Sequence, residues 1–270
     1  MKTQIAVLFL SASVPLCVCA ETALPKELRV LCYNIHAGKG MDGKLDIERL
    51  AKAIMAQKPD LVAIQEIDRM TTRSGKVDQV AELERLTGMN AVFGKTINFS
   101  GGEYGLAILS KFPITGHKVT QLPQMTNQED RGVLEATIQL DDKTSLLFVC
   151  THLCHANDER RIKQAEKINE LFAGHSGPVI LAGDFNATPD NKPIETLRTE
   201  WTDTTCEEPT YPSDKPNIKI DYIFYRPAGT ARVKETHVIK DPLTSDHLPV
   251  LSVLELGVDK ATPTLPAGRK

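Results

Sequence analysis

The sequence lacks an excess of either charge and contains few aromatic residues. Its 270 residues carry a formal net charge of −3, and only 5% of them are aromatic. This composition weighs against a strongly basic nucleic-acid-binding protein. A nearly neutral total charge is still compatible with a local basic groove. After the first twenty residues, no run reaches the roughly 18 consecutive apolar residues that a membrane-spanning helix requires. We therefore expect a globular chain with no transmembrane segment beyond its N-terminal region.

Several motifs of common enzyme classes are also absent. There is no Gly-x-Ser-x-Gly turn for a serine nucleophile, no Gly-rich phosphate loop and no dinucleotide-binding fingerprint. No Cys-x-x-Cys pair is present, which weighs against a structural zinc site. Cys32 and Cys150 lie in apolar runs, so we expect them to be buried thiols. Cys154 and Cys206 lie in polar surroundings and form the better disulfide candidate, although four cysteines allow three pairings.

The N-terminal region resembles a secretory signal peptide. Lys2 supplies a positive charge, residues 5–16 are a short apolar stretch, and Val18, Cys19 and Ala20 form a cleavage site of the expected kind. Residues 1–20 are therefore predicted to be a signal peptide, and the protein is predicted to be exported to the periplasm or the extracellular space. A lipoprotein is the second choice, because neither cysteine of the segment follows a small residue.

Apolar runs of strand length alternate with helical patterns over the rest of the chain. The expected strands span residues 28–35, 61–64, 91–96, 106–109, 133–140, 145–150, 179–181, 220–225, 233–239 and 248–254. The expected helices follow Asp46 and span 77–86 and 157–172. We expect one domain over residues 21–256, built of packed sheets with helices outside, and a disordered tail at residues 257–270.

Polar side chains lie at the ends of these strands at six places. They are Asn34 and His36, Gln65 and Glu66, His152, Asp184 and Asn186, Asp221, and Asp246 and His247. Such groups are costly to bury without partners, and ligands favour the crevice at strand ends, so we expect one shared polar cleft. Carboxylate and amide oxygens suit hard cations such as Mg²⁺, Mn²⁺ or Ca²⁺, which stabilise charge on phosphoryl oxygens.

Seven short motifs in order strengthen this interpretation. They are Tyr-Asn-Ile-His (33–36), Gln-Glu-Ile-Asp (65–68), Leu-Ser-Lys (109–111), Thr-His-Leu (151–153), Gly-Asp-Phe-Asn (183–186), Ile-Asp-Tyr-Ile (220–223) and Ser-Asp-His-Leu-Pro-Val (245–250). The set resembles the endonuclease/exonuclease/phosphatase superfamily over residues 28–254, and in particular its exported bacterial members. The resemblance implies a four-layer α/β sandwich with two central mixed β-sheets flanked by helices. It also implies metal-dependent hydrolysis of phosphomonoester or phosphodiester bonds by water attack.

The resemblance also implies a role for each motif residue. Glu66 is similar to the principal metal ligand, with Asn34 and Asp246 nearby, and Mg²⁺ is the expected cofactor, with Mn²⁺ or Ca²⁺ as alternatives. The implied catalytic residues are Asp184, Asn186, His247, Asp221 and His152. Asp184 and Asn186 would position the water and bind the phosphate. Asp221 would orient His247, and His152 would contact the phosphate. Asn186, His152, Arg69 and Arg131 are the implied substrate contacts.

One departure from the family pattern affects the phosphate pocket. Where many relatives have Gly-Asn-Ala, this chain has Gly-Leu-Ala at residues 105–107, and Glu103-Tyr104 is a candidate substitute. His155 is expected to be a surface residue and Trp201 a packing residue.

The substrate stays open at this point. We expect a monomer that acts on a phosphorylated small molecule or a lipid-derived phosphate. An extracellular DNase-like nuclease is the alternative, so nucleic acid stays a candidate partner. A sphingomyelinase-like lipid phosphodiesterase and a non-catalytic metal-binding module rank lower.

Overall fold

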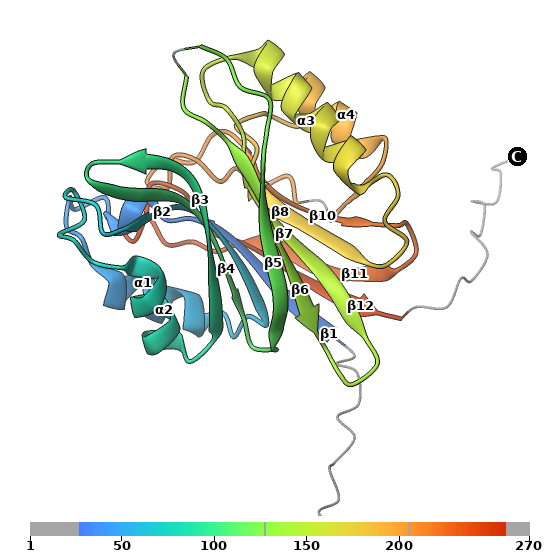
Figure 1. Cartoon of the computed structure of the whole chain (residues 1–270), viewed down its shortest axis with the longest axis horizontal. Helices are drawn as coiled ribbons and strands as arrows, with labels where there is room; N and C mark the ends of the chain where they lie inside the picture. Colours follow the sequence, from blue (N-terminus) through green and yellow to red (C-terminus); the bar gives the residue numbers. More distant parts are fainter. Residues whose placement is uncertain (1–26, 127, 205, 258–270) are drawn as a thin grey trace, which may run out of the picture.

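The structure is a computed structural model that describes residues 27–126, 128–204 and 206–257. Two β-sheets lie face to face, with helices α1 (Ile47–Ala56) and α2 (Gln79–Thr87) outside one and α3 (Asp158–Phe172) and α4 (Lys192–Arg198) outside the other (Figure 1). The predicted signal peptide at residues 1–20 and residues 258–270 of the predicted tail lie outside the described residues. None of the helices in the described ranges is long and apolar enough to cross a membrane.

Each sheet has six strands. The first has the order β11 (Ala231–Val238), β12 (Val250–Leu256), β1 (Glu27–Asn34), β2 (Leu61–Arg69), β4 (Gly102–Ser110) and β3 (Asn90–Phe99). The second has the order β5 (Ile114–Gln121), β6 (Gly132–Gln139), β7 (Ser145–His152), β8 (Val179–Asp184), β10 (Asp221–Arg226) and β9 (Thr202–Asp203). One pair in each sheet is parallel, namely β1 with β2 and β7 with β8.

Both faces of the central strands are buried, which explains their continuous apolar runs. In β1, Val30 and Cys32 belong to the core between the two sheets, whereas Leu31 and Tyr33 pack in the core beneath α1 and α2. A sheet that is covered on both faces has strands without an alternating polar face. The predicted four-layer α/β sandwich with two central mixed β-sheets is confirmed.

Side-chain caps set the beginnings of the helices. Asp46 accepts a hydrogen bond from the Arg49 backbone N–H and begins α1, and Asn157 begins α3 in the same way. The sequence pattern predicts the second helix from residue 77, but Asp78 caps it and α2 begins at Gln79. A side-chain oxygen that accepts from the first free N–H groups stabilises a helix start by about 1 kcal/mol.

Strand pairing brings the polar strand ends to one edge of the molecule. In the first sheet Asn34 pairs with Gln65 across the parallel β1–β2 ladder. In the second sheet Asp184 pairs with His152 on one side and with Asp221 on the other. Because the two sheets face each other, these ends meet, which is what the shared-cleft prediction requires.

The structure also differs from the predicted elements. Strand β5, helix α4 and strand β9 were not predicted, and β2 continues to Arg69 where an end at Ile64 was expected. Strand β5 is an edge strand with mostly exposed side chains, so it has no apolar run. Strand β2 continues beyond its polar residues because a bulge between Gln65 and Ile67 accommodates them. A search for apolar runs does not detect such a bulge.

The disulfide expectation is wrong, because all four cysteines of the described chain are free. Cys154 is buried and donates to the Gln128 side-chain oxygen at 3.2 Å, whereas Cys206 packs against the core between the sheets. Cys32 and Cys150 are the predicted buried thiols, and their sulfurs contact opposite ends of the Gln65 amide.

Gly183 in β8 is expected to tolerate no side chain. A Cβ there would lie 2.3 Å from the Thr151 carbonyl oxygen and 2.9 Å from Thr151 Cγ2. We expect Gly183→Ala to lower the free energy of unfolding by about 1–3 kcal/mol through overpacking, measured by urea denaturation. Gly116→Ala is the matched control, because a Cβ at Gly116 meets nothing within 4 Å. Equal stability of the two variants would contradict this reading of the β7–β8 contact.

Candidate active site

A cleft of about 310 Å³ lies where the strand ends of the two sheets meet. Its lining residues are Glu66, Arg131, His152, His155, Asp184, Asn186, Tyr211, Ile218, Ile220, Asp246 and His247. Of the predicted catalytic and metal-binding residues, Asn34 and Asp221 are not in the lining, but both bond to residues that are. The single polar cleft expected from the strand ends is therefore present.

Asn34 links the two sheets at the floor of the cleft. Its Nδ2 donates to Glu66 Oε1 at 3.2 Å and to Asp184 Oδ2 at 3.0 Å, and its Oδ1 accepts from the His36 backbone N–H at 3.1 Å. Glu66 has φ of +59° at the β2 bulge, a conformation that non-glycine residues seldom adopt and that is concentrated at functional sites. The bulge places the Glu66 carboxylate in the cleft.

His247 is held as a cation by two carboxylates. Its Nδ1 lies 3.0 Å from Asp221 Oδ2, and its Nε2 lies 3.7 Å from Asp184 Oδ2. Burial opposes the charged ring, but Asp221 and Asp184 outweigh that effect and raise the pKa of His247 to about 10. Thr210 donates to the same Asp221 oxygen at 2.5 Å and fixes its position. His247 is thus an imidazolium whose Nε2 is directed at the cleft.

Asp184 is almost completely buried between these groups. Burial, and then the Asp221 charge, raise the pKa of Asp184 to about 7, while His247, the Asn186 backbone N–H and Asn34 oppose the rise. A carboxyl group poised near neutral pH is suited to accept a proton during catalysis.

His152 is neutral, and hydrogen-bond donors face both of its ring nitrogens. Burial, and then the Arg131 charge, hold the pKa of His152 well below its usual range. Arg131 Nη1 lies 3.0 Å from His152 Nδ1, and a guanidinium group can only donate. Nε2 lies 3.0 Å from Asn186 Nδ2, a donor that also bonds to the Leu153 carbonyl oxygen, and 3.5 Å from Asp184 Oδ2.

Two places could hold a cation in the described part of the chain. Glu66 and Asp246 both line the cleft, and Asn34 bonds to Glu66. Asp184, Asp221 and His247 also have ligand atoms within 4.8 Å of one another. The second set is less suitable, because the ring of His247 and the hydroxyl of Thr210 already engage Asp221 Oδ2. The oxygen donors at Glu66 fit a hard divalent cation better.

The structure separates the two arginines that were expected to bind substrate phosphate. Arg131 is buried in the cleft wall. Arg69 is not in the cleft lining, since it pairs with Glu103 at 2.8 Å and stacks over the Phe93 ring at 4.9 Å. A phosphate contact by Arg69 is therefore not supported, because its guanidinium already has partners on β3 and β4.

Several residues of the site were missed from sequence. His155 is exposed, as expected, but it lines the cleft. The Tyr211 ring lies against His247 with ring centroids 4.8 Å apart. Neither stands at a strand end, so the pattern that found the other residues gave no signal. Trp201, expected to be a packing residue, is buried edge-on against Phe172.

Replacing Arg131 by methionine is expected to lower kcat about 10- to 100-fold, the cost of one hydrogen bond to a charged group. Loss of the neighbouring positive charge is expected to raise the pKa of His152. The ¹⁵N chemical shifts of the His152 ring over a pH titration report this change. A methionine variant in which His152 keeps its low pKa would contradict the role of Arg131.

Comparison with known proteins places this geometry in a family. A sequence model described as the endonuclease/exonuclease/phosphatase family matches residues 31–247. Uncharacterized protein YbhP of Escherichia coli (strain K12) is 25% identical over 248 residues, which cover 85% of this chain and 97% of that protein. An inositol phosphosphingolipids phospholipase C of Schizosaccharomyces pombe is 28% identical over 201 residues, which cover 63% of this chain and 44% of that protein.

A solved structure agrees with these matches. The crystal structure of an endonuclease/exonuclease/phosphatase from Beutenbergia cavernae has a TM-score of 0.73 at 25% sequence identity, over 86% of this chain and 72% of that chain. The family match spans most of the chain and includes every strand end that lines the cleft. This chain belongs to the endonuclease/exonuclease/phosphatase family, whose members are hydrolases of phosphoester bonds.

Proposed function

We propose that this chain is a divalent-metal-dependent phosphoesterase that hydrolyses phosphomonoester or phosphodiester bonds by attack of water. The observation that carries the proposal is the position of Asp184. Its Oδ2 lies 3.0 Å from Asn34 Nδ2, 3.5 Å from His152 Nε2 and 3.7 Å from His247 Nε2. A buried carboxylate with a shifted pKa among such partners in a cleft is typical of a catalytic group.

Glu66, Asn34 and Asp246 are the residues proposed to hold the cation, with Mg²⁺ first and Mn²⁺ or Ca²⁺ as alternatives. Two of them are carboxylates and the third is an amide, which are donors that these ions prefer. When bound, such an ion stabilises the negative charge that develops on phosphoryl oxygens. Asn34 contacts both Glu66 and Asp184, so it couples the cation site to the catalytic carboxylate.

The other residues act on water and on the phosphoryl group. Asp184 orients the attacking water and accepts its proton. His247, held by Asp221, donates from Nε2 to a phosphoryl oxygen, and His152 is the second phosphoryl contact. Asn186 contributes an amide beside His152. These donors are fixed before substrate arrives, and preorganised charge of this kind is the main source of acceleration in phosphoryl transfer.

The proposed substrate is a phosphorylated small molecule or a lipid-derived phosphodiester. The similarity to a relative named as a phospholipase C supports the lipid-derived class. The net charge of −3 gives a nucleic acid little electrostatic attraction. We also propose that the protein is exported and monomeric. N-terminal sequencing of the mature protein, expected to begin at Glu21, and light scattering would test these two points.

One magnesium-dependent assay panel tests the proposed activity. It contains 4-nitrophenyl phosphate, bis-nitrophenyl phosphate, sugar and inositol phosphates, sphingomyelin, RNA and plasmid DNA. We expect turnover of a small or lipid-derived phosphoester that EDTA abolishes. Rapid nicking of plasmid DNA would favour a nuclease. No turnover of any substrate with Mg²⁺ or Mn²⁺ would favour a non-catalytic metal-binding module.

A further inference from the structure

The ring of His247 must be held in one orientation if its Nε2 is to donate to the phosphoryl group. Its Nδ1 is bonded to Asp221 Oδ2 at 3.0 Å, and its Nε2 lies 3.7 Å from Asp184 Oδ2. The Nδ1 bond alone does not prevent the ring from tilting about its Cβ–Cγ bond, and such a tilt moves Nε2. A shift of about 1 Å in a catalytic group can lower a rate about 100-fold. The ring therefore needs further restraints.

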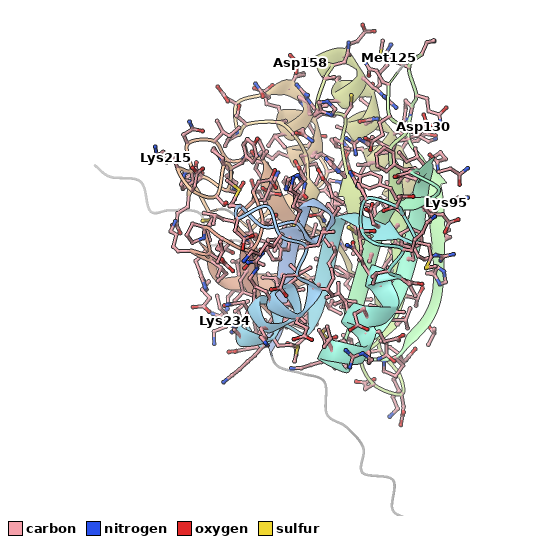
Figure 2. All side chains as sticks on the ribbon, turned by 90° about the vertical axis from the view of Figure 1, so that its left-hand side faces the viewer. Lys95, Met125, Asp130, Asp158, Lys215 and Lys234 are labelled. Atoms are coloured by element: carbon pink, nitrogen blue, oxygen red, sulfur yellow. The ribbon has the colours of Figure 1, made fainter. Side chains whose placement is uncertain are left out.

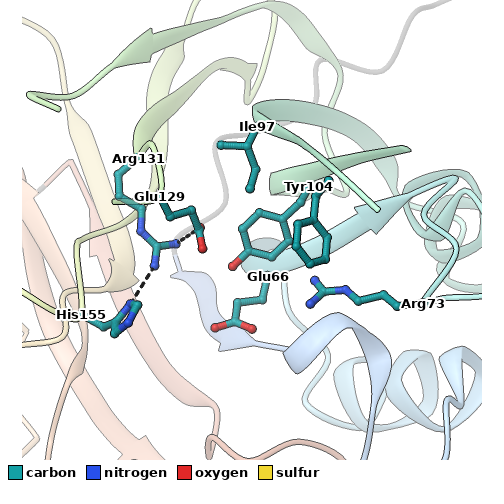
Figure 3. Close-up of a pocket in the computed structure, with 8 residues that line it drawn as sticks. Glu66, Arg73, Ile97, Tyr104, Glu129, Arg131 and His155 are labelled. Carbon is teal, nitrogen blue, oxygen red and sulfur yellow. Dashed lines mark hydrogen bonds and ion pairs between the residues drawn. The ribbon is translucent and has the colours of Figure 1, made fainter. Parts of the chain in front are cut away.

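The other buried imidazole of the cleft is restrained by an arginine. Arg131, which pairs with Glu129 in Figure 3, has its Nη1 3.0 Å from His152 Nδ1. His247 is restrained differently, by residues 210–213, which lie beside it and which we call the bracing segment.

The bracing segment is bonded to both chain neighbours of His247. The Thr210 carbonyl oxygen accepts a hydrogen bond from the Leu248 backbone N–H at 2.7 Å. The Ser213 backbone N–H donates to the Asp246 carbonyl oxygen, also at 2.7 Å. Because these bonds lie on either side of His247, the side chains of the segment keep a fixed place relative to the ring.

Thr210 fixes the carboxylate that holds the ring. Its buried hydroxyl donates at 2.5 Å to Asp221 Oδ2, the oxygen that also bonds to His247 Nδ1. The other oxygen, Asp221 Oδ1, is buried and has no hydrogen-bond partner among the described residues. A hydrogen bond to a carboxylate is stronger than one between neutral groups. The Thr210 hydroxyl is therefore the contact, besides His247 itself, that keeps Oδ2 facing the ring.

Tyr211 lies against the His247 ring. The two ring centroids are 4.8 Å apart, and the planes are inclined at 48°. Tyr211 is itself held by an antiparallel bridge to Ile218, in which each backbone N–H donates to the other residue's carbonyl oxygen at 3.1 Å. Tilted aromatic pairs at roughly this separation attract each other. A ring that is in contact with a fixed neighbour cannot tilt towards it, so Tyr211 restrains the motion that the Nδ1 bond permits.

We propose that Thr210 and Tyr211 are positioning residues for His247, Thr210 through the Asp221 carboxylate and Tyr211 through contact with the imidazole ring. This inference rests on the proposed phosphoesterase function. Together the two residues keep His247 Nε2 directed at one place in the cleft before substrate arrives, and a donor fixed in advance costs no reorganisation during the reaction. Neither residue has to touch the substrate for this role.

The first experiment replaces the Tyr211 ring. Each variant is assayed with Mg²⁺ on phenyl phosphate, ethyl phosphate and their methyl diesters, so that an aryl and an alkyl leaving group are compared. Tyr211→Leu is expected to lower kcat about 10- to 100-fold, by the same factor for both leaving groups and with little change in KM. Tyr211→Phe keeps the ring and is expected to retain most of the turnover.

This comparison separates positioning from substrate binding, because Tyr211 also lines the cleft. A fall confined to the aryl esters, or a rise in KM with unchanged kcat, would make Tyr211 a leaving-group contact and overturn its positioning role.

The second experiment removes the Thr210 hydroxyl. Thr210→Val keeps the shape of the side chain but loses the donor to Asp221. We expect kcat to fall about 10- to 100-fold, the cost of one hydrogen bond to a charged group. Thr210→Ser restores a hydroxyl and is expected to recover most of the turnover. Equal kcat values for the valine and serine variants would contradict the role of Thr210.

A third measurement needs no substrate. The ¹³C relaxation of the His247 ring is expected to show greater mobility in Tyr211→Leu and Thr210→Val than in the wild type, with urea denaturation confirming that both variants are folded. Lys215→Met is the control and is expected to change neither kcat nor ring mobility. Lys215 follows the bracing segment, is exposed outside the cleft lining and lies at the left edge of the molecule in Figure 2.

The outcomes distinguish this inference from the proposed function. A His247 ring that stays immobile in both variants would overturn the inference alone. No turnover of any of the esters by folded wild-type protein would overturn the proposed function, and the relaxation measurement would still test whether Thr210 and Tyr211 restrain the ring.

Discussion

Replacing Asp184 by asparagine is expected to abolish most of the activity and, at the same time, to stabilise the fold. The amide keeps the shape of the carboxylate but accepts no proton, so we expect kcat to fall about 10²- to 10⁴-fold. The stabilisation follows from the environment of the carboxylate, which is buried and close to the negative charge of Asp221. An asparagine at this position removes both costs, and offsets only part of that gain by turning its Nδ2 towards a donor, either the Asn34 amide or the Asn186 backbone N–H.

The gain in stability is expected to depend on pH. Asp184 has a raised pKa in the folded state, about 7 against an ordinary value of 3.8, so the folded protein binds its proton more tightly than the unfolded chain. The free energy of unfolding therefore falls as pH rises through this interval, and the cost is complete above about pH 7. The asparagine variant lacks this cost. The gain in the free energy of unfolding of Asp184→Asn over the wild type should be absent near pH 4 and reach a few kcal/mol at pH 8.

Urea denaturation in EDTA at several pH values measures this effect without a bound cation. Asp214→Asn is a matched control, because Asp214 is exposed and lies outside the cleft lining. It is expected to change neither turnover nor the pH dependence of unfolding. A variant Asp184→Asn with normal kcat would remove Asp184 from the mechanism. If Asp184→Asn were less stable than the wild type at pH 8, the buried Asp184 charge would not be destabilising the fold.

Replacing Glu66 by glutamine is expected to remove the response of the protein to magnesium. The cation stabilises the wild-type fold by mass action, by about 2.7 kcal/mol at a hundred times its dissociation constant, and so raises the Tm. Glutamine fills the same space at the β2 bulge but carries no charge. We therefore expect no rise of Tm with magnesium for Glu66→Gln, and loss of most of the magnesium-dependent turnover.

Thermal unfolding over a magnesium titration, with turnover assayed in parallel, measures both effects. Glu48→Gln, on the exposed face of α1, is expected to respond like the wild type. A retained magnesium response in Glu66→Gln, together with its loss in Asp221→Asn, would move the cation to the cluster of Asp184, Asp221 and His247. Loss of the response in Glu66→Gln alone supports the assignment to Glu66.

Local sequence patterns predicted much of the fold. The strands β1, β7 and β8 were found because both faces of each sheet are covered, which produces unbroken apolar runs. The beginnings of α1 and α3 were found because Asp46 and Asn157 cap them with their own side chains. The edge strand β5 and the short helix α4 gave no comparable signal, since neither buries a continuous apolar face of its own.

The sequence by itself determined the layered α/β class and the strand ends that carry polar groups, because burial and capping act on residues that are neighbours along the chain. The seven motifs in order indicated the family and, through that resemblance, the four-layer sandwich. Only the tertiary structure decided which polar groups touch. Glu66 lies in the cleft because of a bulge in β2, and Arg69 lies outside it because it pairs with Glu103. Arg131 contacts both Glu129 and His152. These contacts depend on the approach of one sheet to the other, and no pattern within a single strand records that approach.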